Sequence, residues 1–388
     1  MIVFSVHERP LYTHNGNIYH PYLNVITKYF GLGDTIIYGC SNFIDIPQEK
    51  AEKLEKVKNA NIKFIQLYRI NSLKSLIQGI KYNNPILKTT IKNSDIIVAR
   101  LPSFSGLQAI HWARKYKKPY MVELIGCAWD GYWNYGIKGK LLAPWIFLLT
   151  KRAVLNATHS VYVTDHFLQH RYPCKGKSIG ASNVSINSVD PKILGERISR
   201  IESGQNNITK IATAAGIDNP VKGQQYVIKA ISYLNSKENP HKYHYYLIGG
   251  GSSKFLKNVA KRYGVEQYIH FVGQVSQKNV ISFLSNIDIY IQPSKQEGLP
   301  RALIEAMSQG CPSIGSNIAG IPELLDKSCL FKKGKVNEII SLLKQFENKE
   351  IMKKQAIRNF ETAKKYQLTE ISKKRNSFFD EFKQDYNI

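Results

Sequence analysis

The 388-residue sequence contains few cysteine residues and no long hydrophobic run. Its longest apolar stretch, residues 141–149, falls short of the ~20 residues that a membrane-crossing helix needs, and Pro144 interrupts it. Residues 1–6 lack the basic segment and cleavage site of a signal peptide and therefore predict a first strand. The five cysteines are scattered without a Cys-x-x-Cys pair, which predicts free thiols in a reducing compartment and no zinc site.

Acidic residues are scarce as well. The chain has 29 Asp and Glu against 54 Lys and Arg, a net charge of +25, and residues 56–94 hold eight basic residues and no acidic one. A solvated basic face is the usual reason for such a run, and the alternative is an anionic lipid, a phosphate-bearing substrate or nucleic acid. Because no zinc-finger or RRM signature accompanies the charge, we expect no nucleic-acid partner.

The length and patterning predict two α/β domains. Hydrophobic residues make up 43% of the chain, an ordinary content for a globular protein, and 388 residues suffice for two cores. Apolar runs alternate with helical patterns in both halves, which is typical of parallel sheets. Expected strands are residues 2–6, 35–39, 62–66, 95–99, 120–125 and 160–164, then 210–214, 245–248, 269–272, 287–291 and 312–315. A helix is expected near Tyr19, after a loop at 13–17. The polar stretch 191–207 is expected to link the domains.

The most informative segment holds Glu297 and Glu305 around a Gly-Leu-Pro loop. An apolar run at 287–292 predicts a buried strand, Pro300 suits the start of a helix, and Gly310 suits its end. The N–H groups of Gly298, Leu299 and the first helical turn would attract a diphosphate. Glu297 would accept hydrogen bonds from sugar hydroxyls, and Glu305 would accept both hydroxyls of a ribose. In the alternative, Glu297 caps backbone amides and Glu305 is a solvated helix residue.

The run Glu-Gly-Leu-Pro-Arg-Ala-Leu-Ile-Glu-Ala-Met resembles the signature of the family 4 retaining glycosyltransferases, also called group 1 glycosyltransferases. Segments 211–223, 245–251, 269–275 and 314–323 keep the family order, so the resemblance covers about 210–325 and the N-terminal half matches loosely. It implies the GT-B fold, with two Rossmann-like domains whose parallel sheets face each other across a cleft. The implied domains are 1–195 on the acceptor side, 206–370 on the donor side, and a C-terminal helix at 371–388 that returns to the first domain.

The resemblance also implies roles for further residues. Lys222 would contact the donor diphosphate, where a cation stabilises the charge of the leaving group, although a surface Lys in a loop is the alternative. The family usually has an Arg shortly before it, after a Gly, but here Gly216 is followed by Ile217. Gly250 lies in a Gly triplet after a strand and, with Gly16 and Gly273, is expected to approach the donor, unless these glycines only make tight turns.

The sequence does not identify the catalytic group of the first domain. Many family members carry a His after the strand that corresponds to 120–125, but none stands here and Asp130 is the candidate replacement. The neighbouring aromatic residues Trp129, Tyr132, Trp133 and Tyr135 suit an acceptor or lipid surface, or plain packing. No Asp-x-Asp occurs in the chain, so we expect a metal-independent enzyme without a cofactor.

These observations predict a retaining glycosyltransferase that moves a sugar from a nucleotide diphosphate donor to a glycan or lipid-linked acceptor in bacterial surface polysaccharide synthesis. The expected location is cytoplasmic, peripheral on the inner face of the cell membrane. Another GT-B enzyme, such as a sugar-nucleotide epimerase, and a basic nucleic-acid-binding protein are the alternatives.

A membrane contact is expected in the acid-free stretch. There Leu73, Leu76, Ile77 and Ile80 form one helical stripe, and Lys74, Lys81 and Lys88 would meet anionic lipid. A core helix with a solvated basic face would give the same pattern.

Overall fold

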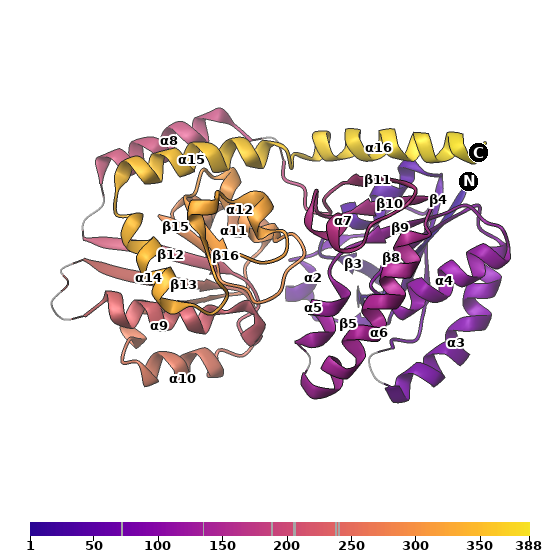
Figure 1. Ribbon diagram of the computed structural model, residues 1–388, viewed down its shortest axis with the longest axis horizontal. Helices are drawn as coiled ribbons and strands as arrows, with labels where there is room; N and C mark the ends of the chain where they lie inside the picture. The colour runs from indigo at the N-terminus through magenta and orange to yellow at the C-terminus, as the bar shows by residue number, and fades with distance from the viewer. Residues whose placement is uncertain (71–72, 135, 188, 205–206, 237–238, 240) are drawn as a thin grey trace. The chain divides into compact units, whose positions relative to one another are not determined.

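A computed structural model describes residues 1–388 apart from 71–72, 135, 188, 205–206, 237–238 and 240, and apart from the side chains of 73, 74, 76, 277 and 278. The chain divides into two compact units (Figure 1). The first consists of Met1–Asn183 with Ser372–Ile388, and the second of Val184–Ile371.

The first unit is built on a seven-stranded parallel sheet in the order β11-β10-β9-β8-β1-β4-β7. Its strands are β1 (Ile2–Val6), β4 (Thr35–Cys40), β7 (Ile62–Gln66), β8 (Ile96–Leu101), β9 (Tyr120–Leu124), β10 (His159–Tyr162) and β11 (Lys177–Gly180). Its longer helices are α3 (Leu73–Lys92), α4 (Phe104–Lys115), α6 (Gly136–Leu155) and most of α16 (Leu368–Asp385), with α5 (Ala128–Trp133) and α7 (Phe167–Arg171) between strands. The central strands are buried on both faces, as their apolar runs predict. The expected strands of this half are confirmed, and β11 is an addition.

A second, four-stranded sheet in this unit corrects one expectation. It has the order β5-β2-β3-β6, from Phe43–Asp45, Leu11–His14, Asn17–His20 and Glu55–Lys56. The helix expected near Tyr19 is wrong, because Tyr19 lies in β3, paired antiparallel with Tyr12 of β2. Asn15 and Gly16 make the hairpin turn at φ 48° and 72°, a conformation that Asn-Gly favours. Short helices α1 (Asn24–Thr27), η1 (Lys28–Gly31) and α2 (Gln48–Ala51) follow.

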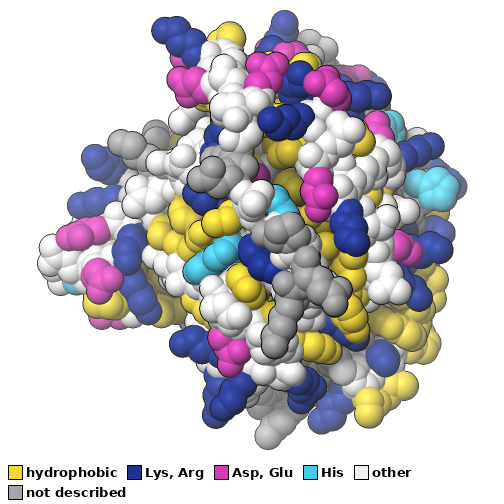
Figure 2. Space-filling view, turned by 90° about the vertical axis from the view of Figure 1, so that its left-hand side faces the viewer, with side chains coloured by type: hydrophobic (Ala, Val, Ile, Leu, Met, Phe, Trp, Pro, Cys, Tyr) yellow, Lys and Arg dark blue, Asp and Glu magenta, His cyan; other side chains and the backbone are white. Residues whose placement is uncertain are grey.

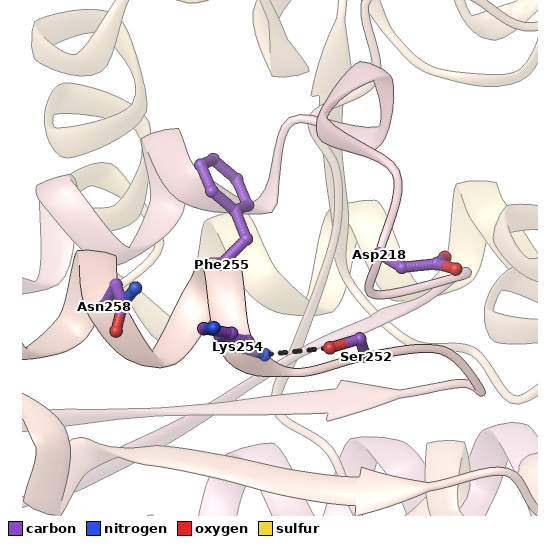
Figure 3. A pocket seen from close by; sticks show the side chains of 5 residues that line it. All are labelled: Asp218, Ser252, Lys254, Phe255 and Asn258. Atoms are coloured by element: carbon purple, nitrogen blue, oxygen red, sulfur yellow. Dashed lines mark hydrogen bonds between the residues drawn. The ribbon is translucent and has the colours of Figure 1, made fainter.

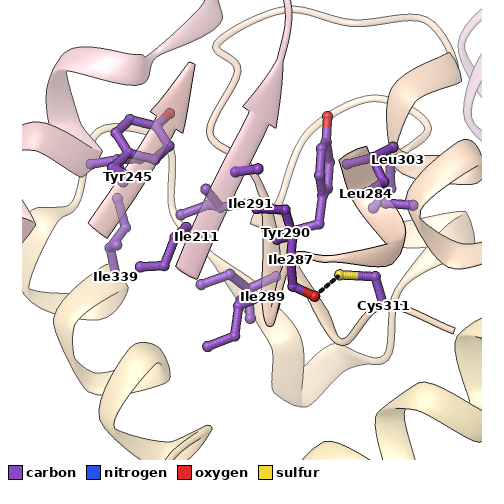
Figure 4. Packing of buried hydrophobic residues seen from close by; sticks show 14 of the residues in the cluster. Ile211, Tyr245, Leu284, Ile287, Ile289, Tyr290, Ile291, Leu303, Cys311 and Ile339 are labelled. Carbon is purple, nitrogen blue, oxygen red and sulfur yellow. Dashed lines mark hydrogen bonds between the residues drawn. The ribbon is translucent and has the colours of Figure 1, made fainter. Parts of the chain in front are cut away.

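The second unit has a six-stranded parallel sheet in the order β14-β13-β12-β15-β16-β17. The strands are β12 (Ile208–Ala214), β13 (Lys242–Ile248), β14 (Ile269–Gly273), β15 (Ile289–Gln292), β16 (Ser313–Ser316) and β17 (Leu330–Phe331). Helices are α8 (Pro191–Ser203), α9 (Gln224–Leu234), α10 (Lys254–Arg262), α11 (Gln277–Ser285), α12 (Arg301–Ser308), α13 (Ile321–Leu324), α14 (Val336–Gln345) and α15 (Lys349–Lys364), with short η2 (Pro220–Lys222), η3 (Glu266–Tyr268) and η4 (Lys327–Cys329). Figure 4 shows Ile211, Tyr245 and Ile291 packed in its core. All five expected strands of this half are confirmed.

Helix α8 occupies the stretch expected as a linker and belongs to the second unit. Asp190 caps its N-terminus by accepting from the Lys192 N–H, and Pro191 opens its first turn. Arg197 is buried and donates to the carbonyls of Gln309, Ile287 and Leu284. The first unit therefore ends at Asn183 instead of residue 195.

Helix α16 supplies core side chains to the first unit. Phe378, Phe379 and Phe382 are buried in the cluster that contains Val3 and Ile36 of the large sheet. Arg375 donates to the carbonyls of Ala181 and Ser182. Helix α16 thus completes the core to which β1 and β4 contribute.

The surface charge is dispersed on the face that Figure 2 shows. Lys and Arg side chains are spread over this face, with Asp and Glu side chains between them. This is the pattern of a solvated surface.

Candidate functional site

The loop between β15 and α12 brings Glu297 and Lys222 together. Glu297 Oε1 accepts from Lys222 Nζ at 2.7 Å, from Ser294 Oγ at 2.6 Å and from Gln292 Nε2 at 3.0 Å. The Glu297 side chain is only 11% exposed, so the ion pair is partly shielded from water. Residues 75 positions apart in the sequence therefore form one charged centre.

The surrounding loops are held in place by further contacts. Tyr290 donates its hydroxyl to Gln292 Oε1 at 2.8 Å, and the Ser316 hydroxyl donates to the Ser294 carbonyl at 2.6 Å. The Lys295 N–H donates to the Val221 carbonyl at 2.8 Å, which ties this loop to η2. Burial raises the pKa of Tyr290 well above its usual value, so its hydroxyl stays protonated as the donor.

Gly223 permits the close approach of these loops. Its φ is +77°, and a Cβ there would lie 1.9 Å from the Pro293 carbonyl oxygen. A side chain at this position would therefore push η2 and the β15–α12 loop apart. Gly223 thus lets η2 pack closely against the loop that carries Glu297, the partner of Lys222.

Helix α12 buries the second carboxylate of the motif. Glu305 is 4% exposed, which excludes the alternative of a solvated helix residue. Pro300 precedes the helix, and Gly310 follows its end at φ +59°, as expected. The Gly298 carbonyl accepts from the Gly320 N–H at 3.0 Å, so the loop is also tied to the segment after β16.

The Gly triplet after β13 packs against the loop after β12. A Cβ on Gly249 would lie 2.1 Å from the Ala215 carbonyl oxygen, and the Gly249 N–H donates to the Gly273 carbonyl. The Gly250 carbonyl accepts from the Ile217 N–H at 3.0 Å. The structure therefore brings Gly250 and Gly273 together in one crowded backbone region, which suits both a tight turn and an approach to the donor.

A pocket opens beside this region (Figure 3). It has a volume of about 390 Å³ and is lined by Asp218, Ser252, Lys254, Phe255 and Asn258. Asp218 comes from the loop after β12, Ser252 from the turn after β13, and the other three residues from α10. The sequence interpretation did not include them, although Ser-Ser-Lys directly after the Gly triplet was the available signal.

Other predicted site residues lie in the first unit. Gly16 is at the tip of the β2–β3 hairpin, and Asp130 is in the first turn of α5, where its N–H donates to Cys127 Sγ. Lys81 and Lys88 are exposed on α3. The side chain of Lys74 lies outside the described residues. The functional roles of these residues stay predictions.

A buried charge cluster in the first unit was not anticipated. Glu123 of β9 accepts from Lys28, Tyr29 and Asn183, and its Oε2 lies 3.5 Å from Arg100 Nε. Burial alone would raise the pKa of Glu123, but the charges of Lys28 and Arg100 hold it below its usual range. The residues come from four distant segments, so the sequence offered no local signal.

The described residues contain no group of three or more His, Cys, Asp or Glu side chains that could hold a metal ion. The charged groups of the candidate site are Lys222 and Glu297, which form an ion pair in the loop before α12, and Glu305 within that helix. An anionic group would be attracted to the helix N-terminus and to the ammonium. Hydroxyl groups would donate to the carboxylates.

Comparisons with known proteins agree with this geometry. Residues 196–363 match the family model described as glycosyl transferases group 1. Protein CapJ of Staphylococcus aureus is 33% identical over 369 residues, which cover 92% of this chain and 88% of CapJ. A Campylobacter jejuni protein named N,N'-diacetylbacillosaminyl-diphospho-undecaprenol alpha-1,3-N-acetylgalactosaminyltransferase is 24% identical, covering 79% of this chain and 82% of that protein. The structure of Anabaena HepE in complex with UDP-glucose is similar with a TM-score of 0.68, at 14% identity, over 98% of this chain and 100% of HepE.

Proposed function

The chain belongs to the group 1 glycosyl transferases and has the GT-B fold, and on this premise we propose that it is a retaining enzyme that transfers a sugar from a nucleoside diphosphate to a glycan or lipid-linked acceptor. The observation that carries this proposal is the Lys222–Glu297 ion pair at the loop before α12, with Glu305 buried in the helix behind it.

The donor assignments follow from the chemistry of these groups. Glu305 accepts the ribose hydroxyls, and the first turn of α12 together with Lys222 holds the diphosphate. Glu297 accepts from hydroxyls of the reacting sugar and orients Lys222 towards the leaving phosphate. The leaving phosphate takes the acceptor proton on the same face of the sugar, so no separate protein nucleophile is required.

Two relatives support the substrate classes. HepE binds UDP-glucose, which favours a nucleoside diphosphate sugar as donor. The name of the Campylobacter jejuni relative gives a diphospho-undecaprenol-linked sugar as its acceptor, which favours a lipid-linked acceptor here. The proposed setting is bacterial surface polysaccharide synthesis, by a metal-independent enzyme on the cytoplasmic face of the membrane.

Peripheral attachment is part of this proposal. No helix in the described ranges is both long and apolar enough to cross a bilayer. On α3, Ile77 and Ile80 are exposed, as are Lys81 and Lys88. These side chains support the predicted membrane stripe, whose members Leu73 and Leu76 have side chains outside the described residues.

A thermal-shift screen of nucleotide sugars tests the proposal directly, because a ligand that binds the native state raises the melting temperature. We expect one donor class to stabilise the protein and Glu305→Ala to reduce that shift, because the variant binds the donor more weakly. The stabilising donor is then incubated with and without glycan acceptors. An epimerised sugar nucleotide formed without acceptor would identify an epimerase, and the absence of any stabilising nucleotide sugar would contradict the donor site.

A further inference from the structure

Helix α6 is apolar on both of its faces. Its inner face, with Ala143, Ile146 and Ala153, is buried in the first unit. Its outer face carries five exposed apolar side chains, which recur every three or four residues and end in an adjacent pair: Ile137 (80% exposed), Leu141 (70%), Trp145 (69%), Leu148 (57%) and Leu149 (47%). We call these five residues the α6 stripe.

A solvent-facing helix normally carries polar residues on its outer side. Single exposed apolar residues are common, but a continuous row of large ones marks a contact with a partner or a membrane. The second unit has isolated examples, such as Tyr233 on α9 and Ile357 on α15. The α6 stripe differs because its members follow one another along a single 20-residue helix.

The charges around the stripe identify the partner. Residues 131–164 contain no Asp or Glu. Lys138 and Lys140 stand in the first turns of α6, and Lys151 and Arg152 stand near its end. An apolar row between two pairs of cations matches an anionic bilayer, whose acyl chains accept the apolar side chains while its headgroups meet the cations.

Aromatic side chains strengthen this match. Trp145 lies in the middle of the stripe, and Trp133 of α5 is 41% exposed next to the first turn of α6. Lys140 Nζ lies 5.5 Å from the centroid of the Trp133 ring. Tryptophan and lysine are the side chains that membrane proteins place at the headgroup level.

We propose that the α6 stripe is a membrane-docking surface that lies in the interface of an anionic bilayer. The helix runs along the interface and does not cross the bilayer, because four cations flank a stripe of only five residues. This surface is separate from the α3 stripe and carries more exposed apolar side chains among the described residues.

The position of α6 connects docking to catalysis, a step that rests on the proposed function. In a parallel α/β sheet, helices run opposite to the strands, so the chain enters α6 at the carboxyl edge after β9 and α5. Ligands of such sheets bind at this edge. Docking through α6 would therefore bring the ligand-binding edge of the first unit towards an acceptor whose lipid is held in the bilayer.

Flotation with vesicles tests the proposal. The stripe variant is Leu141→Ser/Trp145→Ser/Leu148→Ser, and the matched control is Tyr233→Ser/Ile357→Ser, which removes exposed apolar side chains from the second unit. We expect wild type and control to float with vesicles of phosphatidylglycerol and phosphatidylcholine. The stripe variant should bind at least about tenfold less, because the apolar contribution to interfacial binding is lost.

Three further measurements keep the test decisive. Vesicles with brominated lipids should quench tryptophan fluorescence in wild type, and Trp145→Phe should remove most of that quenching. Charge reversal by Lys138→Glu/Lys140→Glu should lower binding to anionic vesicles and make the remaining binding less dependent on salt. The donor-induced thermal shift, measured without vesicles, should be the same in wild type and in the stripe variant.

Three results would overturn the proposal. One is equal flotation of the stripe variant and wild type, including the case in which only Lys81→Glu/Lys88→Glu on α3 abolishes binding. Another is wild-type protein that binds no vesicle. The third is a wild-type dimer that the stripe variant dissociates without any change in vesicle binding, which would make the stripe an interface between copies. If no nucleotide sugar raises the melting temperature of the wild-type protein, the proposed function is refuted, but the result of the flotation test still stands.

Discussion

The Lys222–Glu297 ion pair makes a quantitative prediction about catalysis. Glu297→Gln keeps an amide oxygen that accepts from Ser294 and Gln292, but it removes the charge that holds Lys222 at 2.7 Å. Hydrogen bonds to charged groups contribute about 1.5–3 kcal/mol, which corresponds to about a 10- to 150-fold loss. The two side chains are 28% and 11% exposed, both less than a third, so solvent does not screen the pair as it would an exposed one and the full range applies. We therefore expect kcat to fall by about 10- to 150-fold in Glu297→Gln.

A double-mutant cycle tests whether the two residues act as one unit. Lys222→Met should cause a loss of similar size, and Lys222→Met/Glu297→Gln should be little worse than the worse single variant. The expected coupling is about 1–3 kcal/mol, within the range for residues in direct contact. Initial rates with a saturating donor measure kcat, and melting temperatures establish that each variant is folded. Losses that multiply within a factor of about two would refute the idea of a coupled pair, because independent sites add in free energy.

Four further predictions concern the donor, metals and stability. Glu305→Ala should weaken donor binding by about 10- to 150-fold in calorimetry, since a charged hydrogen bond is lost from a buried site, and an unchanged Kd would contradict the ribose assignment. Activity should survive EDTA while Lys222→Ala loses most of it, whereas loss in EDTA with rescue by Mn²⁺ would point to a metal-held diphosphate. Glu123→Gln should lower the unfolding free energy in urea by about 3–5 kcal/mol, because Lys28 and Arg100 would stay buried without their anion. Since the pKa of Glu123 is lowered in the fold, its contribution to stability is complete above its unfolded pKa near 4.5 and is lost as pH falls below it. The stability of Glu123→Gln should therefore depend less on pH below 4.5 than that of wild type. Burial lowers the pKa of His20 to about 4, while the unfolded imidazole takes a proton near 6.5. The unfolding free energy should therefore fall by at most about 1.4 kcal/mol per pH unit as pH drops from 6.5 towards 4, and His20→Gln should reduce that slope.

The sequence predicted the elements whose signals are local. Buried parallel strands are continuous apolar runs, so the strands of the two large sheets could be located from the order of residues alone. The Gly-Leu-Pro segment likewise carried its own strand, loop and helix signals, and Gly310 ends α12 as expected. The β2–β3 hairpin also had a local signal in Asn15-Gly16, but the expected α/β alternation favoured a helix there.

The features that were missed depend on distant residues. The polar composition of α8 resembled a linker, and its docking depends on Arg197 reaching carbonyls about 90 to 110 residues away. The Glu123 cluster joins Lys28, Arg100 and Asn183, which no window of sequence contains together. The exposure of the α6 stripe was also hidden, because a helix that is apolar all round does not reveal which side its neighbours cover.

The contribution of α16 to the core of the first unit has a consequence for biosynthesis. A ribosome releases residues 1–183 first, but the cluster around Val3 and Ile36 lacks Phe378, Phe379 and Phe382 until nearly 200 further residues have been made. The second unit, residues 184–371, has its whole sequence available earlier. The unit that is translated first is therefore the last to be completed, and its unfinished apolar surface must be protected from aggregation while the rest of the chain is made.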